Sequence, residues 1–178
     1  MKYLIYLITI IFLVGLNLGL FNNLQLFGQI PNLPFLFTLC ASLEKKSYDY
    51  FFVAFISGVL LDFYSTSFFG SFTISLLLVA LCLQALANIV AVFELNWKSL
   101  SLLLISAMVL LNLFYWSYAF AAYKFHWALD FIAFRSVTAA FLPSFFYNLI
   151  FLYPMFLLYN FVKKIIDNLS LRRTRITI

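Results

Sequence analysis

The sequence has few charges, and this scarcity excludes a soluble globular fold. Only 10% of its 178 residues are charged, whereas 66% are hydrophobic, compared with roughly 45–50% in an ordinary soluble domain. The mean hydropathy is +1.06, and a soluble fold of this length needs a far more polar surface. The apolar runs are continuous rather than alternating, which disfavours a transmembrane β-barrel. The composition therefore predicts an all-α, polytopic transmembrane helical bundle.

Residues that bind metals or carry out redox chemistry are also scarce. The two cysteines, Cys40 and Cys82, lie in apolar segments outside any CxxC or Cys/His cluster, and His126 is the single histidine. A metal site needs several ligands, and the sequence has no Ser-His-Asp, HExxH or glycine-rich phosphate-loop pattern. We therefore expect a non-enzymatic protein with no metal and no cofactor. The net charge of +5 does not predict nucleic-acid binding, because the basic residues form no folded soluble face.

Polar breaks divide the chain into six apolar segments, which predict about six helices. The segments cover residues 3–21, 32–43, 50–61, 69–93, 99–123 and 136–162. The second and third would be only about 18 Å long, against a hydrocarbon core of roughly 30 Å. They either continue through the flanking turn residues or form a partly buried hairpin shielded by longer helices. We predict a single transmembrane domain, 1–162, followed by a basic cytoplasmic tail, 163–178.

The distribution of basic residues predicts the orientation of the bundle. With a cytoplasmic N-terminus and six crossings, nine of the eleven basic residues face the cytoplasm, and only Lys124 and Arg135 lie outside. Cytoplasmic loops carry the excess of Lys and Arg, so we expect both termini in the cytoplasm. The loop 124–135 is then external, and the tail is expected to contact anionic lipid, at about 1 kcal/mol per basic residue near the surface.

One acid lies in a run that is otherwise nearly all hydrocarbon. Asp62 follows Gly58 by four residues, so the two share one helical face. A carboxylate at mid-membrane costs about 2.5–3.5 kcal/mol on insertion scales. Asp62 is therefore either a junction residue, which fixes a turn or a partner, or a solvated acid in the headgroup layer.

Further short motifs occur in a fixed order along the chain. Pro31-Asn32 opens the second segment, Gly70 opens the fourth, and Asn148 and Pro154 lie in the last, ahead of the basic tail. Together with the G-x-x-x-D pattern at 58–62, this order resembles the MreD family, the rod-shape-determining integral membrane proteins of bacteria. The likeness covers most of the chain. It departs from the family at 63–67, where the family usually has a glycine-containing turn.

The resemblance implies a multi-pass scaffold in the bacterial inner (plasma) membrane. Its expected role is in cell elongation, where side-wall peptidoglycan synthesis determines rod shape. The direct partner implied is an MreC-like bitopic protein, and the indirect ones are MreB filaments, the RodA polymerase and a class B penicillin-binding protein. The residues expected to form the partner-binding or structural motif are Gly58, Asp62, Gly70, Asn148 and Pro154.

An alternative interpretation is a small-molecule carrier. The six-helix design also resembles the substrate-binding S components of energy-coupling-factor transporters. On this interpretation Gln84, Asn88 and Asn112 line a cavity for a small ligand. Buried amides more often bond between helices, at about 0.6 kcal/mol each, so the same residues also fit a purely structural role.

Overall fold

The computed structural model describes residues 2–23, 25, 28–44, 48–65, 69–90, 97–125 and 134–176, and these ranges contain helices and no β-strand. Each of the six predicted segments corresponds to one helix, so the all-α prediction is confirmed. The predicted loop around His126 and the lysines at 45 and 46 lie outside the described residues. The helices are α1 (Lys2–Gly19), α2 (Leu33–Ser42), α3 (Asp49–Tyr64), α4 (Ser71–Val90), α5 (Trp97–Lys124) and α6 (Phe134–Ile176), with a short 3-10 turn, η1 (Phe21–Asn23).

Three of these helices are long and apolar enough to cross a membrane. The apolar stretches are Lys2–Gly19 in α1, Leu100–Tyr118 in α5 and Phe141–Leu169 in α6, while α2 and Ser71–Leu86 of α4 are shorter apolar helices. A span needs about 20 predominantly apolar residues. The described part of the chain therefore has the composition of a helical membrane protein with at least three candidate spans.

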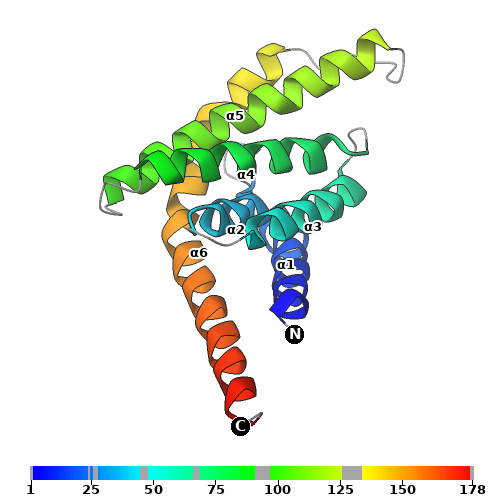
Figure 1. Ribbon diagram of the computed structural model, residues 1–178. Coiled ribbons are helices and arrows are strands. Elements are labelled where there is room, and N and C mark those ends of the chain that lie inside the picture. The colour runs from blue at the N-terminus through cyan, green and yellow to red at the C-terminus, as the bar shows by residue number, and fades with distance from the viewer. Residues whose placement is uncertain are drawn as a thin grey trace.

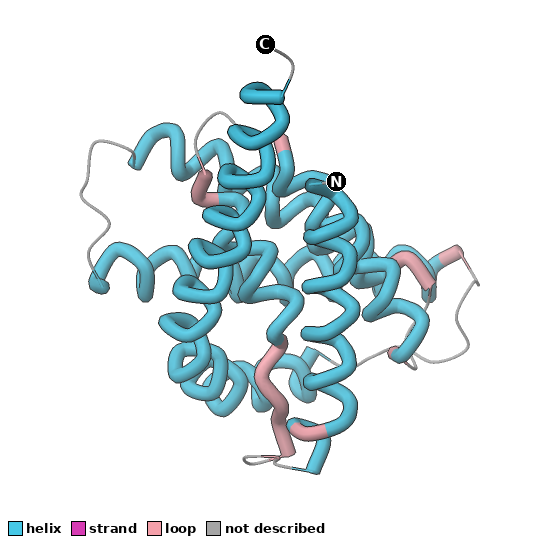
Figure 2. Tube along the Cα trace, turned by 90° about the horizontal axis from the view of Figure 1, so that it is seen from below, coloured by secondary structure: helices cyan, strands magenta, loops and turns pink. Residues whose placement is uncertain are grey.

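Helix α2 lies at the centre of the molecule. It has ten residues, all of them buried, and is about 15 Å long, half of what a span requires. It contacts α1, α3, α4 and α6, and Figure 1 shows it among these helices. Figure 2 shows the helical bundle from below. Of the two possibilities for the short segments, α2 is thus a buried helix shielded by its neighbours. Its hydroxyls bond within the helix, because Thr38 Oγ1 donates to Pro34 O at 2.9 Å and Ser42 Oγ donates to Thr38 O at 2.8 Å.

Neighbouring helices in the chain also contact one another. Helices α3 and α4 pack against each other along the chain, α4 contacts α5, and α5 contacts α6. Figure 1 shows α4 and α5 running across the direction of α1 and of the C-terminal half of α6. One core connects the helices, and its largest fully buried side chains include Tyr6, Phe35, Phe37, Leu104 and Leu152.

Helix α6 is longer than predicted. It covers 43 residues and contains both Pro143 and Pro154, whereas the sequence indicated an end at 162. No glycine or proline follows Pro154, and the Lys, Arg and Leu residues beyond it are good helix formers. The basic tail therefore continues the helix to Ile176. Figure 1 shows that the start of α6, in yellow, runs at an angle to its orange and red part.

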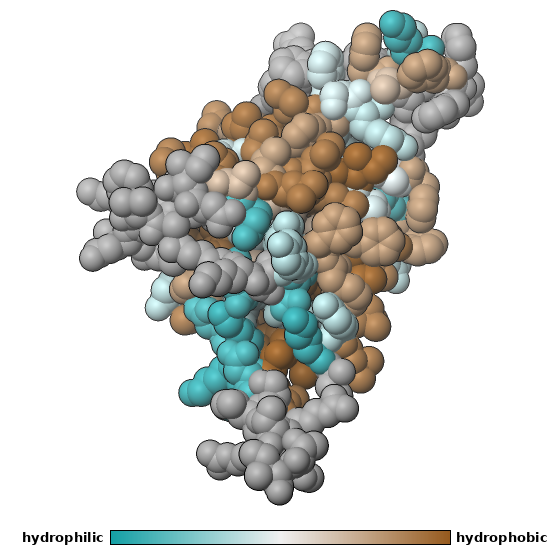
Figure 3. All heavy atoms as spheres, viewed as in Figure 1, coloured by the Kyte–Doolittle hydropathy of each residue, from teal (hydrophilic) through white to brown (hydrophobic). Residues whose placement is uncertain are grey.

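Hydrophilic residues gather near the lower end of the molecule as it is drawn in Figure 3. Apolar residues cover most of the rest of the face seen in that view. In Figure 1 both chain termini lie at that lower end.

Candidate functional site

The Asp62 carboxylate joins the end of α3 to the start of α4. Its Oδ1 accepts from Phe72 N at 2.9 Å and from Ser71 Oγ at 3.3 Å. Its Oδ2 accepts from Thr73 N at 3.0 Å and from Thr73 Oγ1 at 2.5 Å. The two amides belong to the first turn of α4, where backbone N–H groups have no partner within the helix and where a negative charge is stabilised by the helix dipole.

Burial decides between the two interpretations of Asp62. The residue is 4% exposed, so it is not a solvated acid in the headgroup layer. It caps a neighbouring helix with four hydrogen bonds, and bonds to a charged acceptor are roughly twice as strong as neutral ones. Its placement is that of a helix-junction residue whose carboxylate oxygens are occupied inside the chain.

Gly58 lets the same two helices approach closely. A Cβ built at Gly58 would lie 2.4 Å from Thr73 Cα and 2.9 Å from Thr73 N. These are backbone atoms, so only a shift of one helix against the other could make room. Gly58 and Asp62 therefore act at one place, because the glycine brings the start of α4 within reach of the carboxylate.

Gly70 lies at the turn that leads into α4. Its φ is +95°, a conformation that glycine adopts without the steric cost of a Cβ. Its carbonyl accepts from Ile74 N at 2.9 Å, and Tyr118 Oη of α5 donates to the neighbouring Phe69 O at 3.2 Å. The turn is thus tied to α5 as well as to α4.

Asn148 joins α6 to the start of α2. Its Oδ1 accepts from Asn32 N at 2.8 Å, and its Nδ2 donates to Ser144 O at 2.9 Å. Asn32 caps α2, because its Oδ1 accepts from Phe35 N at 3.1 Å. Asn148 is 1% exposed, so its amide replaces water for a backbone donor that would otherwise be buried without a partner.

The five residues of the predicted motif lie in three places. Gly58, Asp62 and Gly70 form the α3–α4 junction, Asn148 forms the α2–α6 junction, and Pro154 lies on the exposed surface of α6. The two junctions join helices within the chain. The contact of any of these residues with a partner stays a prediction.

A charged cluster at the start of α1 is a feature that sequence reasoning missed. Lys163 Nζ lies 2.7 Å from Glu44 Oε1, and Lys2 Nζ lies 2.7 Å from Asp49 Oδ1. Tyr159 Oη also donates to Glu44 Oε2 at 2.5 Å. The sequence held the signal, since Glu44 and Asp49 are two of only six acidic residues and an acid beside a hydrocarbon layer needs a partner.

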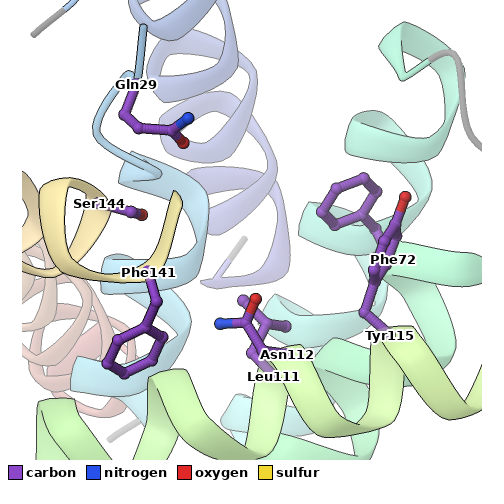
Figure 4. A pocket seen from close by; sticks show the side chains of 7 residues that line it. All are labelled: Gln29, Phe72, Leu111, Asn112, Tyr115, Phe141 and Ser144. Atoms are coloured by element: carbon purple, nitrogen blue, oxygen red, sulfur yellow. The ribbon is translucent and has the colours of Figure 1, made fainter. Parts of the chain in front are cut away.

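A cavity of about 250 Å³ lies between the helices beside Asn112, one of the three amides that the carrier interpretation singled out. Figure 4 shows side chains from α4, α5, α6 and the α1–α2 connection around it: Gln29, Phe72, Leu111, Asn112, Tyr115, Phe141 and Ser144. Asn112 Nδ2 donates to Met108 O at 2.8 Å. Of the three predicted residues, Asn112 lines this cavity and Gln84 does not. Gln84 Nε2 donates to Glu44 O at 3.2 Å, and the side chain of Asn88 lies outside the described residues.

At the two helix junctions, the buried polar side chains of the described residues hold helices together. No group of three or more His, Cys, Asp or Glu residues able to hold a metal ion occurs in the described ranges. The side chains of Asp62 and Asn148 accept hydrogen bonds from the backbone at the starts of α4 and α2, and these bonds fix how the helices meet. Comparison with protein-family models, with curated proteins and with solved structures finds no match to this chain.

Proposed function

We propose that this protein is a membrane scaffold of the MreD type, acting in bacterial cell elongation by binding an MreC-like bitopic partner. The observation that carries the proposal is the placement of the motif residues. Four of the five fix helix junctions, through Asp62 on the first turn of α4, Gly58 against Thr73, Gly70 in its turn, and Asn148 on Asn32 N. A scaffold requires a defined helix arrangement, and these residues provide one.

The proposed location is the bacterial inner membrane, with both termini in the cytoplasm. Lys2 and Lys163 each pair with an acid at the end of the molecule where α1 starts, and both termini lie at that end in Figure 1. Charged groups avoid the hydrocarbon core, and cytoplasmic ends carry more Lys and Arg. The first argument supports a location of this end outside the hydrocarbon core, and the second supports the cytoplasmic side.

The exposed face of α1 is the surface that we propose for the partner helix. Gly15 and Gly19 are exposed, neither has a positive φ, and a Cβ on either would meet nothing within 4 Å. A glycine inside a helix costs about 1 kcal/mol relative to alanine, and no packing inside the chain explains Gly15, whereas Gly19 is the last residue of α1. A small-xxx-small pair lets a second helix approach closely in lipid, where association depends on packing.

Co-purification from membranes tests the proposal. The chain is expressed with a tagged MreC-like protein, as wild type and as Gly15→Leu and Gly19→Leu. We expect the wild type to be recovered with the partner and both variants to lose about tenfold or more, while the variants still insert and fold. Leu113→Phe, an added bulk on the exposed surface of α5, is the matched control and keeps full recovery. Equal recovery of all four proteins would refute the contact face, and no recovery of the wild type would refute the partner.

The cavity favours one alternative, a small-molecule carrier resembling an energy-coupling-factor S component. Its lining includes the polar side chains of Gln29, Asn112, Tyr115 and Ser144. A true ligand raises the unfolding temperature by mass action, by an amount that grows with ligand concentration. Dose-dependent stabilisation by one member of a vitamin panel would favour the carrier, and a flat response across the panel would count against it.

A further inference from the structure

The C-terminal part of α6 is too long to remain in a bilayer. At 1.5 Å per residue the helix of 43 residues measures about 64 Å, roughly twice the hydrocarbon thickness. Even a tilted helix of this length must leave the membrane. The sequence has no charge between Arg135 and Lys163, so the apolar part ends at Lys163.

The charged cluster marks where the bilayer ends along α6. Lys163 pairs with Glu44, and Lys2 pairs with Asp49, so four charged side chains lie together where α1 begins. The side chains of Lys163 and Lys2 are 39% and 42% exposed. Charged side chains with this exposure fit the headgroup layer and not the hydrocarbon interior of the bilayer. The helix beyond this level, residues 163–176, is about 20 Å long. Figure 1 shows it continuing past the start of α1 without a turn.

The arginines of this extension are separated from the lysines. Arg172, Arg173 and Arg175 follow Lys163 by nine to twelve positions, which is about 14–18 Å along the axis. Lipid surface charge is screened within a Debye length, about 8 Å at physiological ionic strength. Lys164 is within reach of anionic lipid, as the sequence predicts, but a helix that keeps its direction carries the backbone of 172–175 beyond one Debye length from the level of Lys163.

The chemistry of the extension fits protein rather than lipid. Three of the four arginines of the chain lie within its last seven residues, and a guanidinium binds a carboxylate through two parallel hydrogen bonds. Ile165 and Leu169 are 36% and 37% exposed on the same helix, which adds apolar contact area near the membrane. We propose that residues 163–176 form a docking helix for an acidic surface of a cytoplasmic protein. This inference rests on the inside location of the C-terminus but not on the MreC-like partner.

Spin-label accessibility separates the protein-binding from the lipid-binding alternative. A Cys40→Ala/Cys82→Ala background of the full chain carries a nitroxide at Thr174→Cys, in nanodiscs with neutral or with phosphatidylglycerol-containing lipid. We expect a water-accessible label with the same accessibility in both lipids. A label at Leu157→Cys, which is 51% exposed and lies six residues before Lys163, should report hydrocarbon. Protection of the label at 174 in anionic lipid would overturn the proposal in favour of a lipid anchor.

A peptide probe tests the acidic partner chemistry. Fluorescence anisotropy follows a labelled peptide of repeated Glu-Glu-Leu as it binds the full chain in neutral nanodiscs. We expect salt-dependent binding that weakens about tenfold or more in Arg172→Glu/Arg173→Glu/Arg175→Glu, because opposite charges become like charges. Lys124→Glu, at the far end of α5, is the matched control and keeps wild-type affinity. Equal affinity of the triple variant would overturn the proposal, and neither outcome depends on co-purification with the MreC-like protein.

Discussion

At the residue scale, the α3–α4 junction depends on an absent side chain and a buried charge. Gly58 leaves room for the backbone of Thr73, and Asp62 satisfies two backbone amides and two hydroxyls at the start of α4. The two residues depend on the same close approach, because the carboxylate of Asp62 reaches α4 only while α3 and α4 are close together. Changes at either residue should therefore act through the fold.

Gly58→Ala should destabilise the protein by about 1–3 kcal/mol, the usual cost of overpacking. The added methyl group would lie 2.4 Å from Thr73 Cα, so α3 and α4 must separate. Gly15→Ala is the matched control, because its methyl group meets nothing within 4 Å and should stabilise α1 by up to about 1 kcal/mol. Reversible unfolding in mixed micelles measures both changes. A Gly58→Ala variant as stable as the wild type would contradict the close packing.

Asp62→Asn should cost about 1–3 kcal/mol for each donor left unsatisfied. The new amide presents an N–H group to donors that need an acceptor, at either Phe72 N or Thr73 N. Ser117→Ala removes an exposed hydrogen bond from Ser117 Oγ to Phe114 O and should cost less than about 1 kcal/mol. The same unfolding assay compares the two variants, and a larger loss with Ser117→Ala would contradict the capping role.

At the scale of elements, α2 is the helix that the others enclose. All ten of its residues are buried, and its start is held by Asn32 and Asn148. Its length does not let it span a membrane, so its stability comes from packing against α1, α3, α4 and α6. A short helix of this kind opens only when its neighbours separate.

Amide hydrogen exchange should therefore be slowest in α2 and much faster at 163–176. Exchange rates follow the free energy of local opening, which is largest in buried elements and smallest at solvated ends. Mass spectrometry of the protein in nanodiscs measures both segments in one experiment. Exchange of α2 as fast as that of the α6 extension would contradict its central place.

Glu44→Gln should loosen the attachment of α6 to the α2–α3 connection. Glu44 accepts from Tyr159 Oη and pairs with Lys163, and removing one partner of a partly buried pair leaves the other charge uncompensated. We expect faster amide exchange around 159–163 with α2 unchanged. Unchanged exchange at 159–163 would show that this pair contributes nothing to the attachment.

At the scale of the whole molecule, the sequence predicted the number of helices in the described residues and their approximate limits, except for the C-terminal end of α6. Charged and polar breaks are unambiguous in a chain with 10% charged residues. It also identified Gly58 with Asp62, because a glycine and an acid four residues apart share a face. It could not supply the acceptor–donor pairs, since Asp62 bonds residues ten and eleven positions away and Asn148 bonds one 116 positions away.

Two features could not be inferred from local patterns. The central place of α2 depends on which helices surround it. An apolar segment of ten residues has the same sequence pattern whether protein or lipid buries it. The extension of α6 was missed because a run of basic residues is equally compatible with a continuing helix and with a solvated, irregular tail. The Glu44 cluster needed three segments far apart in sequence to meet at one level.

Site-directed photo-crosslinking in native membranes tests most directly whether α1 binds the helix of a partner. A benzophenone label is attached at Gly15→Cys or at Leu113→Cys, each in the Cys40→Ala/Cys82→Ala background. We expect an adduct with the MreC-like protein from the label on α1 and none from the label on α5. An adduct from the α5 label alone, or no adduct from the α1 label, would rule out α1 as the contact face.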